Sequence, residues 1–274
     1  MEKAGIEPVK LIFKEGLSLI NGTSVMTALG ALLVEQAIEL VKNYDIISCL
    51  TFEGLMVKKK PFNPVVHRQK PHRGQLQTAE NIWALLEDSQ MVVDEREVEA
   101  QLQPGLNQSE PVFSKKTIED SYSIRCTPQI VGPIRDTLMA IKNVITNEIN
   151  SSNDNPLVIP DEEDVFHNGH FHGQYISMAM DQLSICLTTL SNLSDRRIDR
   201  FMDKNHSNQL PAFLCKETPG LRLGLMGGQF MATSLTAENR SLCHPVSIQS
   251  LTSTGDFQDH VSMGLVAARR AKEI

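Results

Sequence analysis

Two stretches of the sequence repeat apolar side chains at steps of three and four residues, and this spacing constrains the fold most. The first repeat consists of Ile134, Leu138, Ile141, Ile145 and Ile149, and the second of Ile176, Met180, Leu183, Leu187 and Leu190. Side chains at this period lie on one face of an α-helix, where they pack against other helices. The sequence therefore predicts an all-α protein, a bundle of long, near-parallel helices.

The rest of the chain is predicted to contain further helices and two loops. Helices are expected at residues 23–42, 75–88 and 225–241. Residues 55–74 contain three prolines and clustered positive charge, so we expect a long exposed loop there, and residues 87–111 are expected to form a second loop. Because no internal repeat, low-complexity tract or linker is present, the sequence predicts a single, mostly helical domain over residues 1–274.

Composition excludes several classes of protein. The net charge of −7, from 26 basic and 33 acidic residues, does not suit general binding to nucleic acid or to an anionic membrane. The five cysteines are widely spaced, which indicates neither a disulfide framework nor a zinc ribbon. No uninterrupted apolar run of about 18 residues and no apolar signal region is found. We therefore expect a cytoplasmic protein without a membrane or nucleic-acid partner.

Three segments carry more polar groups than a helical bundle requires. Asn21 and Gly22 form a turn directly before a predicted helix, where backbone N–H groups bind anions, although a simple turn explains the same pair. Residues 151–156 are dense in side-chain amides, which a helix stop explains equally. Residues 167–173 contain three histidines, but without a carboxylate or cysteine at a known spacing they do not specify zinc, and no metal site is predicted.

Tyr122 and Arg125 stand three residues apart, so in a helical turn they share a face. A guanidinium group binds a carboxylate with two hydrogen bonds, and a neighbouring phenol acts as an acid or a base. The pair suits a substrate that has a carboxylate near a proton to be removed. A Tyr/Arg pair on an ordinary surface is the alternative.

Taken together and in this order, these segments resemble the aromatic amino acid ammonia-lyases and 2,3-aminomutases, which act on histidine, phenylalanine or tyrosine through a methylidene-imidazolone (MIO) electrophile. The matching strings, spread over nearly the whole chain, are KEGLSLINGTS, EDSYSIRCTPQIVG, EINSSNDNPLV, GHFHGQYISMAMD, AENRSLCHPVSIQSL and QDHVSMGLVAARR. The resemblance implies a helical homotetramer in which each active site is assembled from three subunits.

The resemblance also implies a reaction and roles for the Tyr/Arg pair. Tyr122 matches the catalytic tyrosine of the family, and Arg125 matches the arginine that pairs with the carboxylate of the amino acid substrate. The substrate amine attacks the electrophile, a β-proton passes to a base, and the amine departs to leave an unsaturated acid. Physically this is covalent activation combined with general base catalysis.

Four further residues match substrate-binding positions of the family. Asn21 resembles the asparagine next to the electrophile and the substrate, and Asn155 resembles a polar residue of the site. Phe171 corresponds to an aromatic residue beside the electrophile. Gln258 falls at a polar position that contacts the substrate or the prosthetic group.

The MIO group forms from an internal Ala-Ser-Gly, and the printed sequence contains no such triplet. Residues 4–11 resemble an internal segment of the family, so the chain corresponds to a central part of the family fold, incomplete at both ends. We therefore expect this chain to supply substrate-binding and base residues but not the electrophile, which would come from a longer protein or from a complementing N-terminal chain. By itself the chain is expected to be inactive.

Three functions follow from the resemblance. The first is an ammonia-lyase of the histidine or phenylalanine type, the second is a 2,3-aminomutase of an aromatic amino acid, and the third is a non-catalytic helical subunit or degenerate relative. Gln258 is typical of phenylalanine-type lyases and several aminomutases, whereas Met226 resembles the histidine enzymes. Glu119 stands where members of the family commonly carry glutamine.

Overall fold

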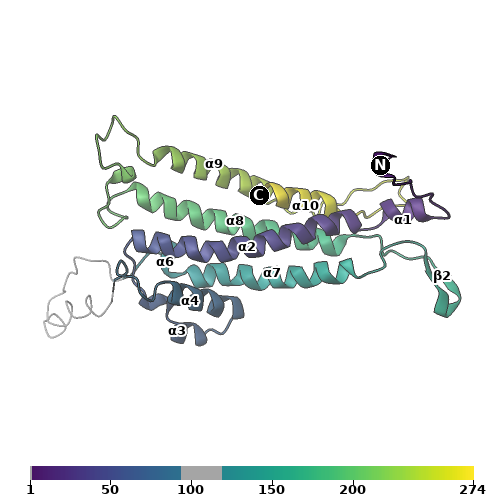
Figure 1. Cartoon of the computed structure of the whole chain (residues 1–274), viewed down its shortest axis with the longest axis horizontal. Helices are drawn as coiled ribbons and strands as arrows, with labels where there is room; N and C mark the ends of the chain where they lie inside the picture. The colour runs from purple at the N-terminus through teal and green to yellow at the C-terminus, as the bar shows by residue number, and fades with distance from the viewer. Residues whose placement is uncertain (1, 94–118) are drawn as a thin grey trace.

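Long helices that lie side by side form the body of the protein (Figure 1). The computed structural model describes residues 2–93 and 119–274. The long helices are α2 (Ser24–Gly54), α7 (Thr127–Ile149), α8 (Gln174–Met202) and α9 (Met226–Leu242), and α10 (Gly264–Glu273) packs against α8 and α2. The predicted all-α bundle is confirmed.

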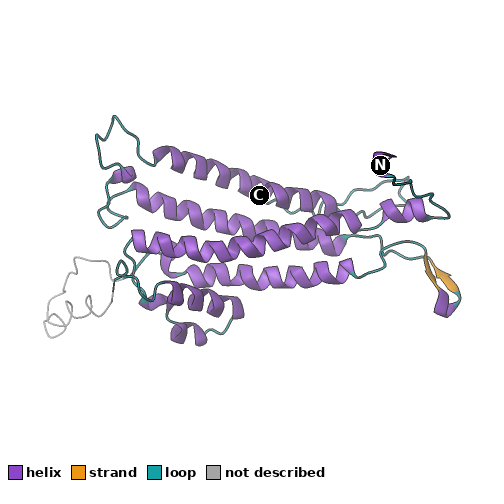
Figure 2. Cartoon of the chain, in the orientation of Figure 1, coloured by secondary structure: helices purple, strands orange, loops and turns teal. Residues whose placement is uncertain are grey.

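Shorter elements lie toward the two ends of the long helices (Figure 2). One end holds α1 (Glu15–Asn21) and a projecting hairpin of β1 (Leu157–Ile159) and β2 (Asp164–Phe166), which are joined by η4 (Pro160–Glu162). Toward the other end lie η2 (Lys60–Phe62), α3 (Pro64–Arg68), α4 (Arg73–Leu85), α6 (Tyr122–Arg125) and η5 (Ala212–Leu214). The strands are antiparallel, with Val158 opposite Val165. A short 3-10 turn, η1 (Glu2–Ala4), begins the described chain.

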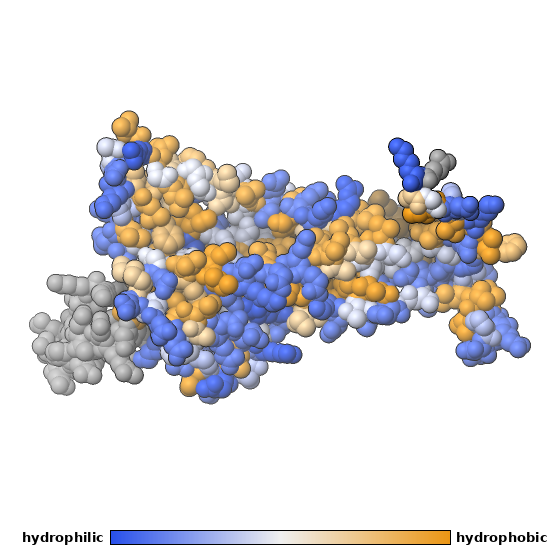
Figure 3. Space-filling model, viewed as in Figure 1, coloured by the Kyte–Doolittle hydropathy of each residue, from blue (hydrophilic) through white to orange (hydrophobic). Residues whose placement is uncertain are grey.

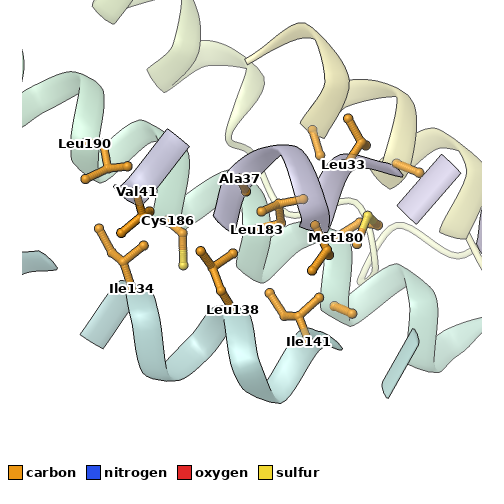
Figure 4. Packing of buried hydrophobic residues seen from close by; sticks show 14 of the residues in the cluster. Leu33, Ala37, Val41, Ile134, Leu138, Ile141, Met180, Leu183, Cys186 and Leu190 are labelled. Atoms are coloured by element: carbon orange, nitrogen blue, oxygen red, sulfur yellow. The ribbon is translucent and has the colours of Figure 1, made fainter. Parts of the chain in front are cut away.

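The two apolar repeats of the sequence, except for the exposed Ile149 at the end of α7, pack in the core between α2, α7 and α8. Figure 4 shows the side chains of the three helices directed toward one another. The buried residues include Leu33, Ala37, Val41, Ile134, Leu138, Ile141, Met180, Leu183 and Leu190. Burying one such side chain contributes about 1.5–3 kcal/mol. Because the repeat continues along each helix, the helices stay in contact over most of their length.

Residues 55–74 do not form the long exposed loop that their prolines and charges predicted. Pro64 begins α3, where the missing N–H of proline is not needed for helical hydrogen bonding. Phe62 is fully buried and stacks on Phe52 of α2 with 5.0 Å between ring centroids. His67 is also buried and contacts the Pro61 carbonyl oxygen at 2.9 Å. The prolines therefore start short helices over a second apolar cluster.

Several helix boundaries differ from the predictions. The helix expected to end near residue 42 continues to Gly54, because Tyr44, Ser48 and Phe52 remain buried. Neither α1 nor α10 was predicted; the buried side chains of α10 are alanines, which are too small to produce a strong apolar repeat. Most of the loop expected at residues 87–111 lies outside the described residues.

Parts of the bundle expose apolar side chains. Figure 3 shows such side chains gathered over α9, where Phe230, Met231 and Leu235 are exposed. Residues 15–54 are also apolar and long enough to cross a bilayer by composition. However, α2 buries Asp45, which accepts a hydrogen bond from Asn81 of α4 at 2.6 Å, as a core helix of a bundle does. Exposed apolar surface of this extent is typical of an interface.

The contact between α4 and α7 generates a stability prediction. A Cβ atom on Gly74 would lie 2.2 Å from the Gly132 carbonyl oxygen, and a Cβ atom on Gly132 would lie 2.5 Å from the Gln75 Cα. We expect Gly74→Ala and Gly132→Ala each to lower the free energy of unfolding by about 1–3 kcal/mol in urea titrations, because the backbones must separate. Gly227→Ala, in open space on α9, is the control and is expected to change it by less than about 1 kcal/mol. Wild-type stability of Gly132→Ala would contradict this packing.

Candidate functional site

One end of the bundle brings together polar segments that are far apart in the sequence. The Lys14 ammonium, just before α1, contacts the Asp154 carboxylate and donates to the Pro156 carbonyl oxygen at 2.9 Å. The Ser18 hydroxyl of α1 also donates to Asp154. These contacts hold α1 against the loop that follows α7.

Asn21 was expected in a turn whose position faces the N-terminus of the next helix. In the structure it is instead the last residue of α1 and lies at the C-terminus of that helix. It is half-buried. The next residue has to be small, because a Cβ atom on Gly22 would lie 2.5 Å from the Asn153 side-chain oxygen. The Asn-Gly pair therefore lets α1 approach the amide-rich loop closely.

Asn155 and Phe171 lie at this same end of the bundle. The Asn155 side-chain oxygen accepts a hydrogen bond from the Asn168 N–H at 2.8 Å, which ties the loop after α7 to the histidine-containing segment. The His170 ring contacts the Ser152 carbonyl oxygen at 3.2 Å. Phe171 is partly exposed. Among the described residues no group of three or more His, Cys, Asp or Glu side chains is arranged to hold a metal ion.

Gln258 belongs to a loop that reaches this end from the other side. The His172 ring contacts the His260 carbonyl oxygen at 3.1 Å, and the Gly173 N–H donates to the Ser262 hydroxyl at 3.0 Å. The Gln258 side-chain oxygen accepts from the Ser253 hydroxyl at 2.8 Å, so in this chain it stabilises its own loop.

Tyr122 and Arg125 form the single turn of α6 and share a face, as their spacing predicts. The Arg125 guanidinium lies 5.0 Å from the centroid of the Tyr122 ring. The same guanidinium forms an ion pair with Glu119, with 2.7 Å between nitrogen and oxygen. The Tyr122 side chain is 70% exposed. The pair therefore presents a cation and a phenol on the surface of the bundle.

The length of α7 separates this pair from the other candidate residues. Tyr122 and Arg125 precede the first residue of α7, and Asn155 follows its last residue. At 1.5 Å per residue the 23 residues of α7 span about 35 Å. Within one chain the six predicted residues therefore occupy two places at opposite ends of the bundle (Figure 1).

Two polar contacts beside Tyr122 and Arg125 were not predicted from the sequence. Asp120, directly before α6, accepts a hydrogen bond from the Lys58 N–H at 2.8 Å, and Arg197 of α8 donates to the Ser123 carbonyl oxygen at 2.9 Å. Each contact joins residues more than 60 positions apart, so no local pattern marks it. The available signal is that Arg197 follows Leu190 by seven residues and so continues the face of the predicted apolar repeat.

The contact between α1 and the loop after α7 generates a prediction about pH. The Lys14 ammonium and then the Ser18 hydroxyl lower the pKa of Asp154 to about 2. The pKa is lower in the folded protein than the ordinary value of about 3.9, so the contact stabilises the fold above about pH 4 and this stabilisation is lost as the pH falls toward 2.

We expect Lys14→Met to return the pKa of Asp154 toward its ordinary value in an NMR titration of the carboxyl carbon. Lys142→Met removes an ammonium that lies 2.7 Å from Glu35, and as the control it is expected to leave Asp154 unchanged. If Asp154 still titrates near pH 2 in Lys14→Met, the described contact is not the cause.

Comparison with known proteins places this geometry in a family. The family described as aromatic amino acid lyase matches residues 1–274. The tyrosine ammonia-lyase of Cupriavidus metallidurans is 44% identical over 275 residues, which cover 100% of this chain and 51% of the relative. The MIO-dependent tyrosine 2,3-aminomutase of Streptomyces globisporus is 43% identical over 276 residues, which cover 100% of this chain and 51% of the relative.

The solved structure of Pantoea agglomerans phenylalanine aminomutase is 61% identical and superposes with a TM-score of 0.95, covering 99% of this chain and 53% of that chain. The present chain thus spans about half the length of the relatives that it matches. Because the family match extends from the first residue to the last, the chain belongs to the aromatic amino acid lyase family and has the helical fold of the histidine and phenylalanine ammonia-lyases.

Proposed function

We propose that the protein to which this chain belongs removes the amino group of an aromatic L-amino acid, and that this chain supplies the groups that hold the carboxylate and take the β-proton. The observation that carries the proposal is the contact on α6 between the exposed Tyr122 ring and the half-buried Arg125 guanidinium. A one-turn helix presents both side chains on one face, so a substrate carboxylate on the guanidinium lies within reach of the phenol.

The chemistry of the pair matches the two demands of the elimination. The Arg125 fork binds the substrate carboxylate with paired hydrogen bonds, which fixes the orientation of the amino acid. As a phenolate, the Tyr122 oxygen then takes the β-proton; the C–H electron pair forms the new double bond and the amine leaves with the C–N electron pair.

The residues at the other end of the bundle suit the electrophile of the family. Asn21 and Asn155 are partly buried neutral amides, and Phe171 adds an apolar ring in the segment that begins with Asn168, to which Asn155 is hydrogen-bonded. The Asn155 oxygen is already used by Asn168, which leaves its N–H groups as donors within the described part of the chain. Amide donors and an aromatic face fit an uncharged, planar group such as MIO, which supplies an electrophilic carbon for the substrate amine. Similarity to an MIO-dependent aminomutase supports this assignment.

We propose that a homotetramer brings the Tyr122 and Arg125 pair of one copy to the end of another copy that carries Asn155. About 35 Å separates them in one chain, too far for a single amino acid to bridge. The exposed apolar side chains of α2 and α9, among them Leu32, Leu50 and Phe230, support burial against further copies. If a second copy packs antiparallel to the first, its α6 lies beside the end of the first copy that carries Asn155.

Intersubunit complementation tests this arrangement. We expect Tyr122→Phe and Asn155→Ala homotetramers of the full-length protein each to lose most activity, and mixed tetramers reassembled from both to regain part of it, because some sites then receive both native residues. Reassembled tetramers of one variant alone are the control. If the mixture stays as inactive as its components, each site is built within a single chain.

Tyr122→Phe also tests the base. Removing the phenol oxygen keeps the ring that lies against Arg125, so the carboxylate contact is retained and the proton transfer is lost. We expect kcat to fall by about 10²–10⁴-fold with a much smaller change in KM. A fall in kcat/KM that arises only from KM would remove Tyr122 from the proton transfer.

Glu119 competes with the substrate for Arg125 in this proposal, since its carboxylate already pairs with the guanidinium. An exposed ion pair is worth about 0.2–1 kcal/mol, so Glu119→Gln is expected to lower KM by up to about fivefold. Glu35→Gln, which breaks a similar exposed pair with Lys142, is the matched control and is expected to leave KM unchanged. A raised KM in Glu119→Gln would show that Glu119 helps to bind substrate instead.

We propose 2,3-aminomutation of phenylalanine as the overall outcome, because the phenylalanine aminomutase of Pantoea agglomerans is 61% identical. A lyase shares the elimination and then releases ammonia and the unsaturated acid, and similarity to a tyrosine ammonia-lyase supports it as the alternative. Incubating the full-length protein with L-phenylalanine separates them: accumulation of β-phenylalanine supports the aminomutase, and accumulation of cinnamate alone supports the lyase. If neither phenylalanine, tyrosine nor histidine is consumed, the chain belongs to a non-catalytic relative.

A further inference from the structure

The helix α6 that carries Tyr122 and Arg125 is too short to be stable alone. It has four residues, and no side chain caps its first turn. Forming a single turn costs more conformational entropy than its hydrogen bond returns, so a one-turn helix depends on the structure around it. Ile124, buried in the cluster around Phe52, is one anchor.

Arg197 of α8 is a second anchor, and it lies beneath α6. Its side chain is buried, and each of its three nitrogens donates a hydrogen bond. The acceptors are the Ser123 carbonyl oxygen of α6 at 2.9 Å, the Ser48 hydroxyl of α2 at 2.6 Å and the Thr127 hydroxyl at 2.7 Å. The guanidinium carbon also lies 5.0 Å from the ring centroid of Phe52.

A second connection from Arg197 to α6 passes through Thr127. Residue 128 is proline and has no N–H to offer to the Ile124 carbonyl oxygen. The Thr127 hydroxyl donates to that carbonyl at 2.6 Å instead, while its oxygen accepts from Arg197. Two consecutive carbonyl groups of α6 are therefore tied to one guanidinium group, the first directly and the second through a hydroxyl.

Burying the Arg197 guanidinium costs desolvation free energy, so we expect such a residue only where the geometry of its hydrogen bonds matters. Within the described residues Arg197 forms no ion pair; its three hydrogen-bond acceptors are neutral oxygens. Burial accordingly lowers the pKa of the guanidinium, although Tyr44, Cys49 and Asp45 oppose the shift. A buried cation without a paired anion stabilises a fold less than an apolar side chain of similar size. What the guanidinium provides instead is a rigid, planar set of donors in three fixed directions.

We infer that Arg197 is a positioning residue that holds α6 in the orientation in which Tyr122 and Arg125 act on one substrate. The inference rests on the proposed function for its catalytic consequence, but its structural part concerns α6 alone. Lysine keeps the charge but reaches only one of the acceptors properly, so it tests the geometry, whereas methionine removes the donors altogether.

Arg135 provides a matched control. It is a partly buried arginine of α7 that pairs with Asp45 and donates to the Thr78 hydroxyl at 3.0 Å; within the described part of the chain it has no hydrogen bond or ion pair with α6. Loss of Arg135 removes a hydrogen bond to a threonine hydroxyl, as loss of Arg197 does, and in addition an ion pair that Arg197 does not have. A change localised to α6 that the Arg197 variants show and Arg135→Met does not therefore reports the anchoring of that helix by Arg197.

The experiment uses the full-length, assembled protein in four forms: wild type, Arg197→Met, Arg197→Lys and Arg135→Met. Hydrogen exchange of the peptide that covers residues 119–127 is measured by mass spectrometry. We expect this peptide to exchange at least about tenfold faster in both Arg197 variants than in Arg135→Met, since two carbonyl groups of α6 lose their anchor. Equal exchange in all three variants would overturn the inference, whatever the protein catalyses.

Kinetics and inhibitor binding then test the link to the site. We expect kcat/KM to fall by about a hundredfold in Arg197→Met and to stay near the wild-type value in Arg135→Met. Cinnamate, which has a carboxylate, is expected to bind more weakly to Arg197→Met, while 2-phenylethylamine, which has none, binds as to wild type. Equal weakening of both ligands, or an equal loss of kcat/KM in Arg135→Met, would reduce Arg197 to a stabilising role. A wild-type protein that binds neither ligand refutes the proposed function, and the exchange measurement still decides the placement of α6.

Discussion

Packing of the apolar faces of α2, α7 and α8 is the interaction on which the rest of the structure depends. The buried side chains of these helices contact one another along their length, so the helices run side by side and their lengths set the distance between the two ends of the bundle. The polar segments that carry Asn21, Tyr122, Arg125, Asn155 and Phe171 directly precede or follow one of these helices, and the loop of Gln258 joins α9 to α10. Where a segment lies in space is therefore decided by the helix end to which it is joined, and α7 carries Tyr122 and Arg125 before its start and Asn155 after its end.

The polar contacts of the bundle serve mainly to hold short segments at these ends. Lys14 and Ser18 fasten α1 to Asp154, and Arg197 together with Thr127 fastens α6 to α8. These segments are too short to keep their conformation alone, since a single helical turn or a short loop buries little apolar area. An apolar bundle whose end segments are held by hydrogen bonds and ion pairs is well suited to present reactive groups at defined positions. The sides of the bundle remain free to pack against other copies of the chain.

Much of the fold could be predicted from the sequence, and the predictions that were wrong failed for physical reasons. The repeats from Ile134 to Ile145 and from Ile176 to Leu190 face the core as predicted, with Leu187 half-buried, because a helical period reports directly which face is covered. Ile149, the last residue of the first repeat, is instead exposed at the end of α7. Residues 55–74 were expected to form a loop but contain η2 and α3, which pack against α2. The prediction was wrong because prolines at the first positions of helices look the same in a sequence as prolines that end helices. The small alanine face of α10 gave no apolar repeat, although it is fully covered.

The sequence by itself determined the properties that depend on neighbouring residues: the helical period, the single turn that places Tyr122 and Arg125 on one face, and the family motifs around Asn21, Asn155, Phe171 and Gln258. Only the tertiary structure decided that these motifs occupy two ends of the bundle and that a buried arginine supports one of them. The reason is that local periodicity reports on a few successive turns of chain, whereas the contact from Arg197 to Ser123 joins residues 74 positions apart and exists only after α2, α7 and α8 have packed together.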